Sequence, residues 1–384
     1  MHRDQELTLI ERSLAVLAAP GVAAPDDEAQ IPVGQYVDPT QFDREVQRIF
    51  RPALNVVALS SAVAQPGDFI TADVMGTPVL VVRGDDGTAR AFINVCRHRG
   101  ATVEGRASGR CKAFVCPYHA WTYGTDGRLR HVRHPEGFPS LRGVDTTLVP
   151  LCCLEGAGLL WVCPDPAASH LEFDPDTQRL IAELEGLLGP QPTAFATHVR
   201  DWNANWKLVT DGGLESYHFR IAHRDTIAPF FTDTASTYEF IGDHIRSVLP
   251  RRSLAELVDR PRETWRLREH ANVLYTLHPN AMLLVQDSHF ELILSTPLDP
   301  GRTRIAVSTV GRPPGPDGYG ERARAFLQRN HALTCATLAE DFVLAEQIQA
   351  GLHTGANEHF RLGRFEGALR QWHRRLDARL DLSG

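Results

Sequence analysis

The chain of 384 residues has almost no lysine. Lys112 and Lys207 are its only lysines, so arginine supplies nearly all of the 40 basic residues. The arginines are scattered rather than clustered, and 47 acidic residues bring the formal net charge to −7. A nucleic-acid partner requires a basic field. The charge balance therefore argues against nucleic acid as the main partner, and we attribute the lysine scarcity to genomic base composition.

Signals for export or membrane insertion are also missing from the sequence. The N-terminal residues include Asp4 and Glu6 and lack the basic region and apolar run of a secretory signal peptide. No run approaches the ~18 uninterrupted apolar residues that a membrane-spanning helix needs. The seven cysteines are odd in number, and five of them lie between residues 96 and 153, which is unsuited to a secreted disulfide framework. We therefore expect a cytoplasmic protein that has no membrane partner.

The residue pattern predicts three consecutive parts. Helical spacing at 7–17 and a linker to about residue 30 predict an N-terminal helix and linker over 1–40. Short β-rich runs broken by turn signals, such as Gly-Asp-Asp-Gly at 84–87, predict a small all-β domain over 41–165. After a Pro- and Asp-rich connector with a short helix at 178–188, an α+β domain is expected over 190–384. Its expected strands are 273–277, 281–285, 290–295 and 303–311, in an antiparallel meander, and its expected long helices are 321–352 and 366–380.

Two short motifs in the β-rich part each pair one cysteine with one histidine. Cys96 and His98 form the first, Cys116 and His119 form the second, and each follows a predicted strand. Two thiolates and two imidazoles suit either one structural zinc ion or a Rieske [2Fe–2S] cluster, with both thiolates on one iron and both imidazoles on the other. Zinc fingers usually pair like ligands in sequence. Because each motif here combines one cysteine with one histidine, the two-iron cluster is favoured. A single zinc ion and two unrelated buried Cys-His pairs remain as alternatives.

At these residues the sequence resembles the catalytic (alpha) subunits of Rieske non-haem iron oxygenases, the ring-hydroxylating oxygenase family. The likeness is carried by NVCRHRG at 94–100, CPYHAWTY at 116–123 and the glycine-rich turn at 124–129. The resemblance implies a Rieske domain that holds a [2Fe–2S] cluster. It also implies a larger catalytic domain of the helix-grip type, with an antiparallel sheet and long helices.

A second group of candidate ligands lies in the α+β part. A helix is predicted from 205–207 through Glu215 and His218 to His223. Glu215 and His218 are three apart and share a helix face. His218 and His223 are five apart, ~140° around an ideal helix, so both reach one ion only if the helix ends or distorts between them.

A third ligand can come from far along the chain. Asp341 lies on an otherwise apolar helical track, and a buried acid needs a partner that a metal would supply. Its neighbour Glu340 is the alternative, and sequence alone separates the two acids poorly. Two histidines and one carboxylate would leave iron positions open for O₂ and substrate.

The order of these motifs is similar to the catalytic domain of the same family. Asn-Trp-Lys at 205–207, Glu-x-Tyr-His-x4-His and the late Glu-Asp carry the likeness. The resemblance implies that His218, His223 and Asp341 hold a mononuclear Fe(II). It implies that Glu215 joins this iron to the Rieske histidine of a neighbouring subunit, and hence a homotrimer. Asp-Gly-Gly at 211–213 departs from the family's acid-Asn-aromatic pattern and weakens the analogy of substrate.

The resemblance implies the terminal oxygenase component of an O₂-dependent system. No nucleotide-binding glycine motif is found in the sequence, so NAD(P)H would act only through a separate reductase, with or without a ferredoxin. The main expectation is mono- or dioxygenation of a small aromatic molecule, as in aromatic hydrocarbon catabolism. It rests on six candidate pocket aromatics, although similar residues would also form a cation–π cage for a quaternary ammonium group: Phe230, Phe231, Tyr238, Trp265, Tyr275 and Phe290.

Three other functions are kept as alternatives. Oxidative N-demethylation or monooxygenation of a quaternary or methylated amine is favoured by Glu215, because amine-demethylating members of the family carry Glu at this position. A non-catalytic Rieske electron carrier would need only one metal centre, and would leave the α+β part without a purpose. A zinc-stabilised binding protein would need no iron.

Overall fold

The computed structural model describes residues 1–18, 28–141, 143–168, 170–311, 315 and 318–381. It divides into two compact units. The first comprises Met1–Ile49, Asp174–Gly189 and Thr193–Gly384, and the second comprises Phe50–Phe173 and Pro190–Pro192. Most of the linker predicted after the first helix falls on residues 19–27 and so lies outside the described residues.

The second unit is built from short antiparallel strands. One sheet has the strand order β10-β5-β4-β3-β6, and two three-stranded sheets have the orders β11-β12-β2 and β7-β8-β9. The strands are β2 (Asn55–Leu59), β3 (Asp68–Val74), β4 (Thr77–Arg83), β5 (Ala89–Ile93), β6 (Ser108–Arg110), β7 (Ala113–Val115), β8 (Thr122–Gly124), β9 (Leu129–His131), β10 (Pro150–Leu151), β11 (Cys153–Gly156) and β12 (Leu159–Val162). The all-β fold predicted for this part is confirmed.

Glycine-containing turns connect the strands of two hairpins in this unit. The Gly84 N–H donates to the Thr88 carbonyl 2.9 Å away, and Gly87 adopts a φ of 79°, which closes the predicted turn between β4 and β5. The equivalent turn between β8 and β9 uses Gly127 at a φ of 78°. The two Cys-His motifs follow β5 and β7, so each is held on a loop anchored by a paired strand.

The first unit is organised around a seven-stranded antiparallel sheet with the order β13-β19-β18-β17-β16-β15-β14. Its strands are β13 (Thr193–Trp202), β14 (Thr237–Ile241), β15 (His244–Pro250), β16 (Ala271–Leu277), β17 (Ala281–Val285), β18 (Phe290–Asp299) and β19 (Arg302–Gly311). The four predicted strands of the meander are confirmed, and β18 extends four residues beyond its predicted end. A separate ribbon pairs β1 (Ala29–Pro32) with β20 (His359–Leu362).

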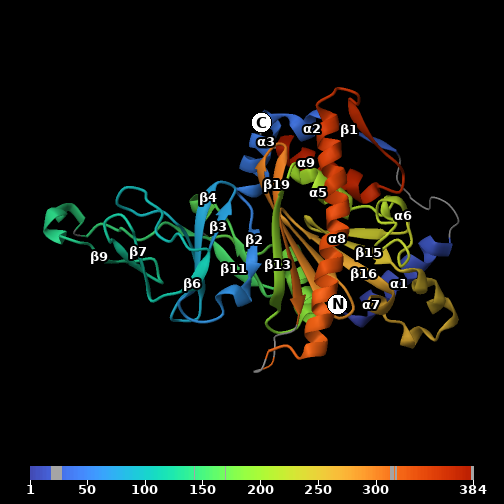
Figure 1. The fold of residues 1–384 in the computed structure, drawn as a ribbon, viewed down its shortest axis with the longest axis horizontal. Helices are drawn as coiled ribbons and strands as arrows, with labels where there is room; N and C mark the ends of the chain where they lie inside the picture. The colour runs from blue at the N-terminus through green and yellow to red at the C-terminus, as the bar shows by residue number, and fades with distance from the viewer. Residues whose placement is uncertain (19–27, 142, 169, 312–314, 316–317, 382–384) are drawn as a thin grey trace. The chain divides into compact units, whose positions relative to one another are not determined.

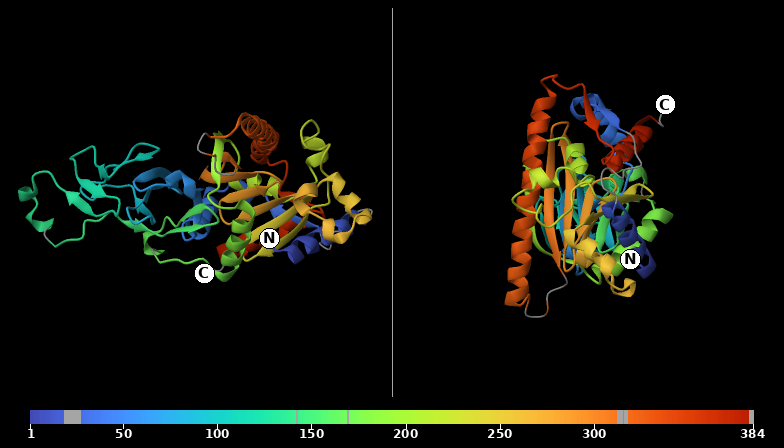
Figure 2. Two further views of the ribbon diagram at one scale, coloured as in Figure 1. Left: turned by 90° about the horizontal axis from the view of Figure 1, so that it is seen from below. Right: turned by 90° about the vertical axis from the view of Figure 1, so that its right-hand side faces the viewer.

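Helices cover both faces of the seven-stranded sheet. The long helix α8 (Glu321–Leu352) has the predicted limits and lies along one face, as Figure 1 and Figure 2 show. The other helices of the unit are α1 (Arg3–Ala18), α2 (Gly34–Val37), α3 (Pro39–Glu45), α4 (Pro175–Leu188), α5 (Trp206–Gly213), α6 (Phe219–Ala222), α7 (Leu267–His270) and α9 (Gly367–Asp381). No helix in the described part of the chain is long and apolar enough to cross a membrane.

The prediction of one continuous helix from 205 to 223 is wrong. Helix α5 ends at Gly213, and the single turn α6 begins only at Phe219. Two consecutive glycines disfavour a continued helix because each loses more backbone entropy than alanine does. Gly213 also has a packing reason, since a Cβ on it would lie 2.8 Å from the Sδ atom of Met282.

Candidate metal sites and the cavity beside them

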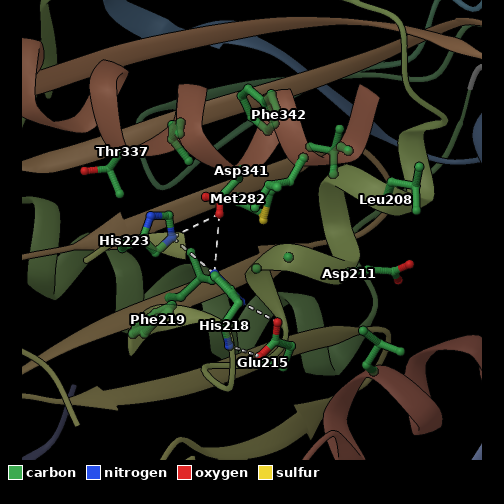
Figure 3. Close-up of a pocket in the computed structure, with 18 of the residues that line it drawn as sticks. Leu208, Asp211, Glu215, His218, Phe219, His223, Met282, Thr337, Asp341 and Phe342 are labelled. Atoms are coloured by element: carbon green, nitrogen blue, oxygen red, sulfur yellow. Dashed lines mark hydrogen bonds and ion pairs between the residues drawn. The ribbon is translucent and has the colours of Figure 1, made fainter. Parts of the chain in front are cut away.

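Three candidate ligands of the α+β unit converge on one point. His218, His223 and Asp341 each offer a ligand atom, and these atoms lie within 4.8 Å of one another. The Nε2 atoms of the two histidines are 3.2 Å apart. Asp341 Oδ1 lies 2.9 Å from His223 Nε2 and 3.4 Å from His218 Nε2 (Figure 3). Two imidazoles and one carboxylate on one side of a point are a donor set that suits iron with open positions.

The elements explain why these residues meet. The break after α5 frees the chain at residues 214–218, and α6 then places the two histidines at either end of one helical turn. The straight helix α8 crosses the sheet and brings Asp341 to them. The predicted condition, a helix that ends or distorts between the two histidines, is met because α6 ends at Ala222, and His223 follows it with backbone angles outside the helical range.

A second layer of carboxylates orients the histidine rings. Glu215 bonds His218 through its Nδ1 atom, and Glu340 Oε2 lies 2.8 Å from His223 Nδ1. The Thr226 hydroxyl donates to the same Glu340 oxygen at 2.7 Å. With both Nδ1 atoms engaged, both Nε2 atoms turn toward Asp341, as metal-binding histidines do when their other nitrogen is held by a carboxylate. The residues present therefore fit a single metal ion.

Burial and the two neighbouring carboxylates have opposite effects on the pKa of His223. Burial alone would lower the pKa of His223, but its hydrogen bonds and charge interactions with Asp341 and Glu340 outweigh burial and raise the pKa. The site thus stabilises positive charge at His223.

A cavity of about 850 Å³ opens beside His218, His223 and Asp341. Its walls are mainly apolar and come from α5, α6, α8 and the sheet, with Leu208, Phe219, Met282 and Phe342 shown in Figure 3. Of the six aromatics expected in a pocket, Phe230 and Phe231 line it, whereas Tyr238, Trp265, Tyr275 and Phe290 are not among its described lining residues. Strand geometry explains the case of Tyr275, because Leu274 faces the cavity and the next residue points to the opposite face, where its hydroxyl bonds Glu183 of α4.

Carboxylates also line the cavity near His218. Asp211, Glu215 and Glu366 all contribute to its wall. Burial and the neighbouring charges of Glu215 and Asp211 raise the pKa of Glu366. The carboxylate of Asp211 is held by two hydrogen bonds. The Tyr36 hydroxyl donates to it at 2.8 Å, and His373 Nε2 lies 2.9 Å from its other oxygen. This wall therefore favours a cationic group.

The two Cys-His motifs come together in the β unit. The rings of His98 and His119 lie 4.6 Å apart, and both cysteines are buried. His98 stacks on Trp121 at 4.9 Å, and in the described part of the chain its buried Nδ1 atom has no hydrogen-bond partner. A buried, unpartnered imidazole nitrogen between aromatic rings suits a metal bond, because an orphaned polar atom is otherwise costly. The donor set fits a [2Fe–2S] cluster of the Rieske type.

Local hydrogen bonds fix this second site. The Tyr123 hydroxyl lies 3.3 Å from Cys96 Sγ and accepts from the Arg97 N–H at 3.0 Å. Burial raises the pKa of Cys116. On the exposed side, Arg99 Nη2 lies 2.6 Å from His119 Nε2. Desolvation and the Arg99 charge lower the pKa of His119.

Several residues around the cavity were missed from the sequence. Thr226, Tyr36 and His373 act through contacts with residues far along the chain, which no local pattern reveals. Arg251 and Asn272 also line the cavity and touch each other through Arg251 Nη2 and Asn272 Oδ1 at 2.9 Å. Arginine is so frequent in this chain that Arg251 carries no signal in the sequence.

Comparison with protein families matches both units. Residues 53–142 match the Rieske [2Fe–2S] domain, and residues 192–382 match the ring hydroxylating alpha subunit (catalytic domain). The chain belongs to the Rieske non-haem iron oxygenases, as an alpha subunit with both characteristic domains. In this family the first domain holds a [2Fe–2S] cluster, the second binds a mononuclear iron, and the enzymes are oxidoreductases that incorporate oxygen.

Individual members of this family show sequence similarity to the chain. The carnitine monooxygenase oxygenase subunit of Acinetobacter baumannii is 34% identical over 220 residues, which are 57% of this chain and 57% of that protein. The glycine betaine monooxygenase oxygenase subunit of Chromohalobacter salexigens is 33% identical over 201 residues, covering 51% of this chain and 44% of the relative. The match thus spans about half the length of these curated relatives, 57% of the first and 44% of the second.

A solved structure shares the fold. The quaternary ammonium Rieske monooxygenase CntA in complex with L-carnitine superposes with a TM-score of 0.77 at 23% identity, over 91% of this chain and 96% of that chain. The expected α+β, helix-grip architecture is confirmed. The relatives named here concern quaternary amines, so they agree with the alternative expectation and do not support a role in aromatic hydrocarbon catabolism.

Proposed function

We propose that this chain is the terminal oxygenase component of a Rieske system that monooxygenates a methylated ammonium compound. The observation that carries the proposal is the carboxylate wall of Asp211, Glu215 and Glu366 beside His218. A cationic nitrogen bound there gains Coulomb energy in a partly desolvated cavity. The names of the relatives, which specify carnitine and glycine betaine, support the same substrate class.

Each metal site is proposed with the residues that would hold it. Cys96, Cys116, His98 and His119 would hold the [2Fe–2S] cluster, and His218, His223 and Asp341 would hold the iron. When bound, these groups supply single-electron storage and the activation of O₂. The domain limits 41–165 and 190–384 stay predictions.

The protein's own residues have defined tasks in this proposal. Glu215 and Glu340 hold the two histidine rings in the tautomer that leaves Nε2 free for the metal. Phe219, Phe342 and the leucines of the wall exclude water from the cavity. One oxygen atom enters a C–H bond of the substrate, and the other leaves as water with two protons and a pair of electrons from a partner protein. Hydroxylation at a carbon attached to nitrogen then releases an aldehyde and a smaller amine.

Partners form part of the proposal. A separate reductase, with or without a ferredoxin, is proposed to supply the electrons. A homotrimer is proposed because Glu215, beside the iron site of one chain, would then reach the Rieske histidine of a neighbour. Chain-to-chain contact of this kind requires a head-to-tail ring.

Hydroxylation of an aromatic molecule is the second candidate. It is supported by the phenylalanines of the cavity, Phe219, Phe230, Phe231 and Phe342, and by its otherwise aliphatic wall. Such a wall binds a flat apolar ring through buried area and aromatic contacts.

Product analysis with a surrogate reductase tests the proposal. Anaerobically purified protein is supplied with NADH, reductase and O₂, and is screened against carnitine, glycine betaine, choline and a set of aromatic acids. The expected result is O₂-dependent release of an aldehyde from one of the methylated amines. Hydroxylated aromatic products, with no amine turnover, would instead establish the second candidate.

A further inference from the structure

We infer that Arg251, fixed by Asn272, is the binding site for a carboxylate group of the substrate. The inference deepens the proposed function by naming a second recognition group on the molecule that enters the cavity. It holds equally for a carboxylated amine and for an aromatic acid, because both carry the same anionic group.

The position of Arg251 gives the first argument. It directly follows β15, lines the cavity and is half-buried. Its Nη2 atom donates to Asn272 Oδ1 at 2.9 Å, and its guanidinium lies 5.8 Å from the centre of the Phe231 ring. These contacts hold the planar group in place but satisfy only one of its five N–H donors.

Arg251 has no ion-pair partner, which gives the second argument. No carboxylate among the described residues forms an ion pair with it, and the exposed Asp287 acts on it only through a charge interaction. The buried Arg246 on β15, by contrast, is paired with Glu183 at 2.5 Å. Burial lowers the pKa of Arg251. A partly desolvated guanidinium with free donors binds a carboxylate through two parallel hydrogen bonds.

Two neighbouring strands contribute further polar side chains to the cavity wall that contains Arg251. In the antiparallel register Val273 lies opposite Val285, so Asn272 and Gln286 fall at adjacent positions where β16 begins and β17 ends. Both line the cavity. The Asn272 Nδ2 group has no partner among the described residues, and it offers a donor beside the guanidinium. Together Arg251, Asn272 and Gln286 form a polar end of the cavity.

This polar end is separated from the carboxylate wall. Met282 packs against Gly213, next to Asp211 and Glu215, whereas Gln286 lies four residues further along the same strand direction. At ~3.3 Å per residue this spacing is ~13 Å. The cavity is therefore negative near His218 and positive at Arg251. A zwitterion with an ammonium group at one end and a carboxylate at the other matches this polarity and would present the carbons beside its nitrogen to the iron site.

Binding measurements with matched probes test the inference without relying on turnover. Isothermal titration of the holoprotein compares carnitine with its methyl ester, and phenylpropanoate with phenylpropanamide. In each pair the second molecule lacks the negative charge and keeps the carbon skeleton of the acid. Wild-type protein is expected to bind the acid of at least one pair more tightly than its neutral partner. Because hydrogen bonds to charged groups are worth about tenfold to a hundredfold in affinity, Arg251→Gln is expected to weaken acid binding by that factor and to leave the neutral probe within about twofold.

Three variants make the result specific. Arg251→Lys keeps the charge but loses the two-pronged geometry, and is expected to restore part of the acid preference. Arg252→Gln removes an exposed neighbouring arginine outside the cavity wall and is expected to match wild type. Arg361→Gln removes the exposed cavity arginine on β20 and tests the rival site. Iron content and the thermal unfolding midpoint confirm that Arg251→Gln is folded.

The outcomes separate this inference from the proposed function. Wild type that binds neither acid, or an acid preference that survives in Arg251→Gln or disappears in Arg361→Gln, would overturn the assignment. Arg251-dependent acid binding without aldehyde release from any amine would support Arg251 and contradict the proposed substrate class. Turnover of choline but not of carnitine would support amine oxidation and overturn the role of Arg251.

Discussion

Adjacent acids on α8 contact different atoms of the same histidine. Asp341 lies 2.9 Å from His223 Nε2, on the side where both rings converge, whereas Glu340 lies 2.8 Å from Nδ1. We therefore expect Asp341→Asn to remove most mononuclear iron, and Glu340→Gln to weaken iron affinity by about tenfold to a hundredfold while retaining the site. Iron titration monitored by elemental analysis measures both, and the visible spectrum reports the cluster.

His218→Ala provides the matched control for this pair. It should abolish turnover and leave the cluster spectrum intact, because the proposed cluster ligands lie in the other unit. Loss of the cluster in this variant would contradict the assignment of two separate metal sites. Iron retained by Asp341→Asn but lost from Glu340→Gln would reverse the roles of the two acids.

Local motifs made it possible to predict from the sequence which histidines come together. Cys96 with His98, and His218 with His223, are close along the chain, so spacing alone marks them. The choice between Asp341 and Glu340 was not predictable, because both positions fit one long helix and only the packing of α8 shows which oxygen faces Nε2. The same limit applies to Arg251, whose significance depends on a cavity formed by several strands.

Helix α5 carries a buried ion pair that links it to α3. Lys207 Nζ lies 2.6 Å from Glu45 Oε1, and both side chains are nearly inaccessible. The Trp206 indole N–H donates to the other Glu45 oxygen at 2.8 Å. Removing one member of such a pair leaves a buried charge alone, so Glu45→Ala should lower the free energy of unfolding by ~3–5 kcal/mol. Urea unfolding followed by far-UV circular dichroism measures the change.

Replacing both members separates lost pairing from lost packing. The double variant Glu45→Met with Lys207→Met removes both charges and keeps most of the volume, so it should regain most of the lost stability. If the double variant were as unstable as Glu45→Ala, the cost would come from packing or from the Trp206 hydrogen bond rather than from the unpaired ammonium group.

A buried histidine joins α4 to β15 and makes the stability of the fold depend on pH. His244 Nε2 lies 2.9 Å from the Thr177 hydroxyl, and its Nδ1 accepts the His278 N–H at 3.0 Å, which suits the neutral ring. Burial lowers the pKa of His244. Above pH ~6.5 the ring is neutral in both states and contributes no slope. As the pH falls below that value, the unfolded chain binds a proton that the folded chain does not, so stability falls by up to ~1.4 kcal/mol per pH unit.

His244→Gln tests this slope. Glutamine does not titrate, so the difference in unfolding free energy between pH 7 and pH 5 should be smaller in the variant than in wild type. Equal slopes would show that other groups account for the acid sensitivity. Urea unfolding at each pH provides the comparison.

Element limits were predicted well where the pattern is regular and poorly where glycine intervenes. Periodicity located α8 and β17 to the residue, because α8 is long and β17 is strongly apolar. The region after α5 was misread as helix because the apolar spacing continues past two glycines. The contact of Gly213 with Met282, which requires a residue without a side chain, comes from tertiary packing that the local pattern does not contain.

The whole molecule should contain two kinds of iron and depend on a partner. Metal analysis of anaerobically purified protein is expected to give about three irons per chain, two in the cluster and one in the mononuclear site. NADH alone should support no turnover, because the sequence has no nucleotide-binding glycine motif. Two irons per chain would favour the electron carrier, zinc alone would contradict both iron functions, and full turnover with NADH alone would contradict the need for a reductase.

Electron transfer between chains can be tested by mixing two inactive variants. Cys116→Ser should lack the cluster and His218→Ala should lack the mononuclear iron, so neither homo-oligomer should turn over substrate. If Glu215 connects the iron site of one chain to the Rieske site of its neighbour, a mixed ring contains junctions where an intact cluster site faces an intact iron site. Random equal mixing places such a pair at about one quarter of the junctions of a head-to-tail ring. Coexpressed variants should therefore recover about a quarter of wild-type activity, and Glu215→Ala introduced into the Cys116→Ser chain should remove it. Complete inactivity of a mixture shown by mass spectrometry to be hetero-oligomeric would mean that each chain uses its own two sites.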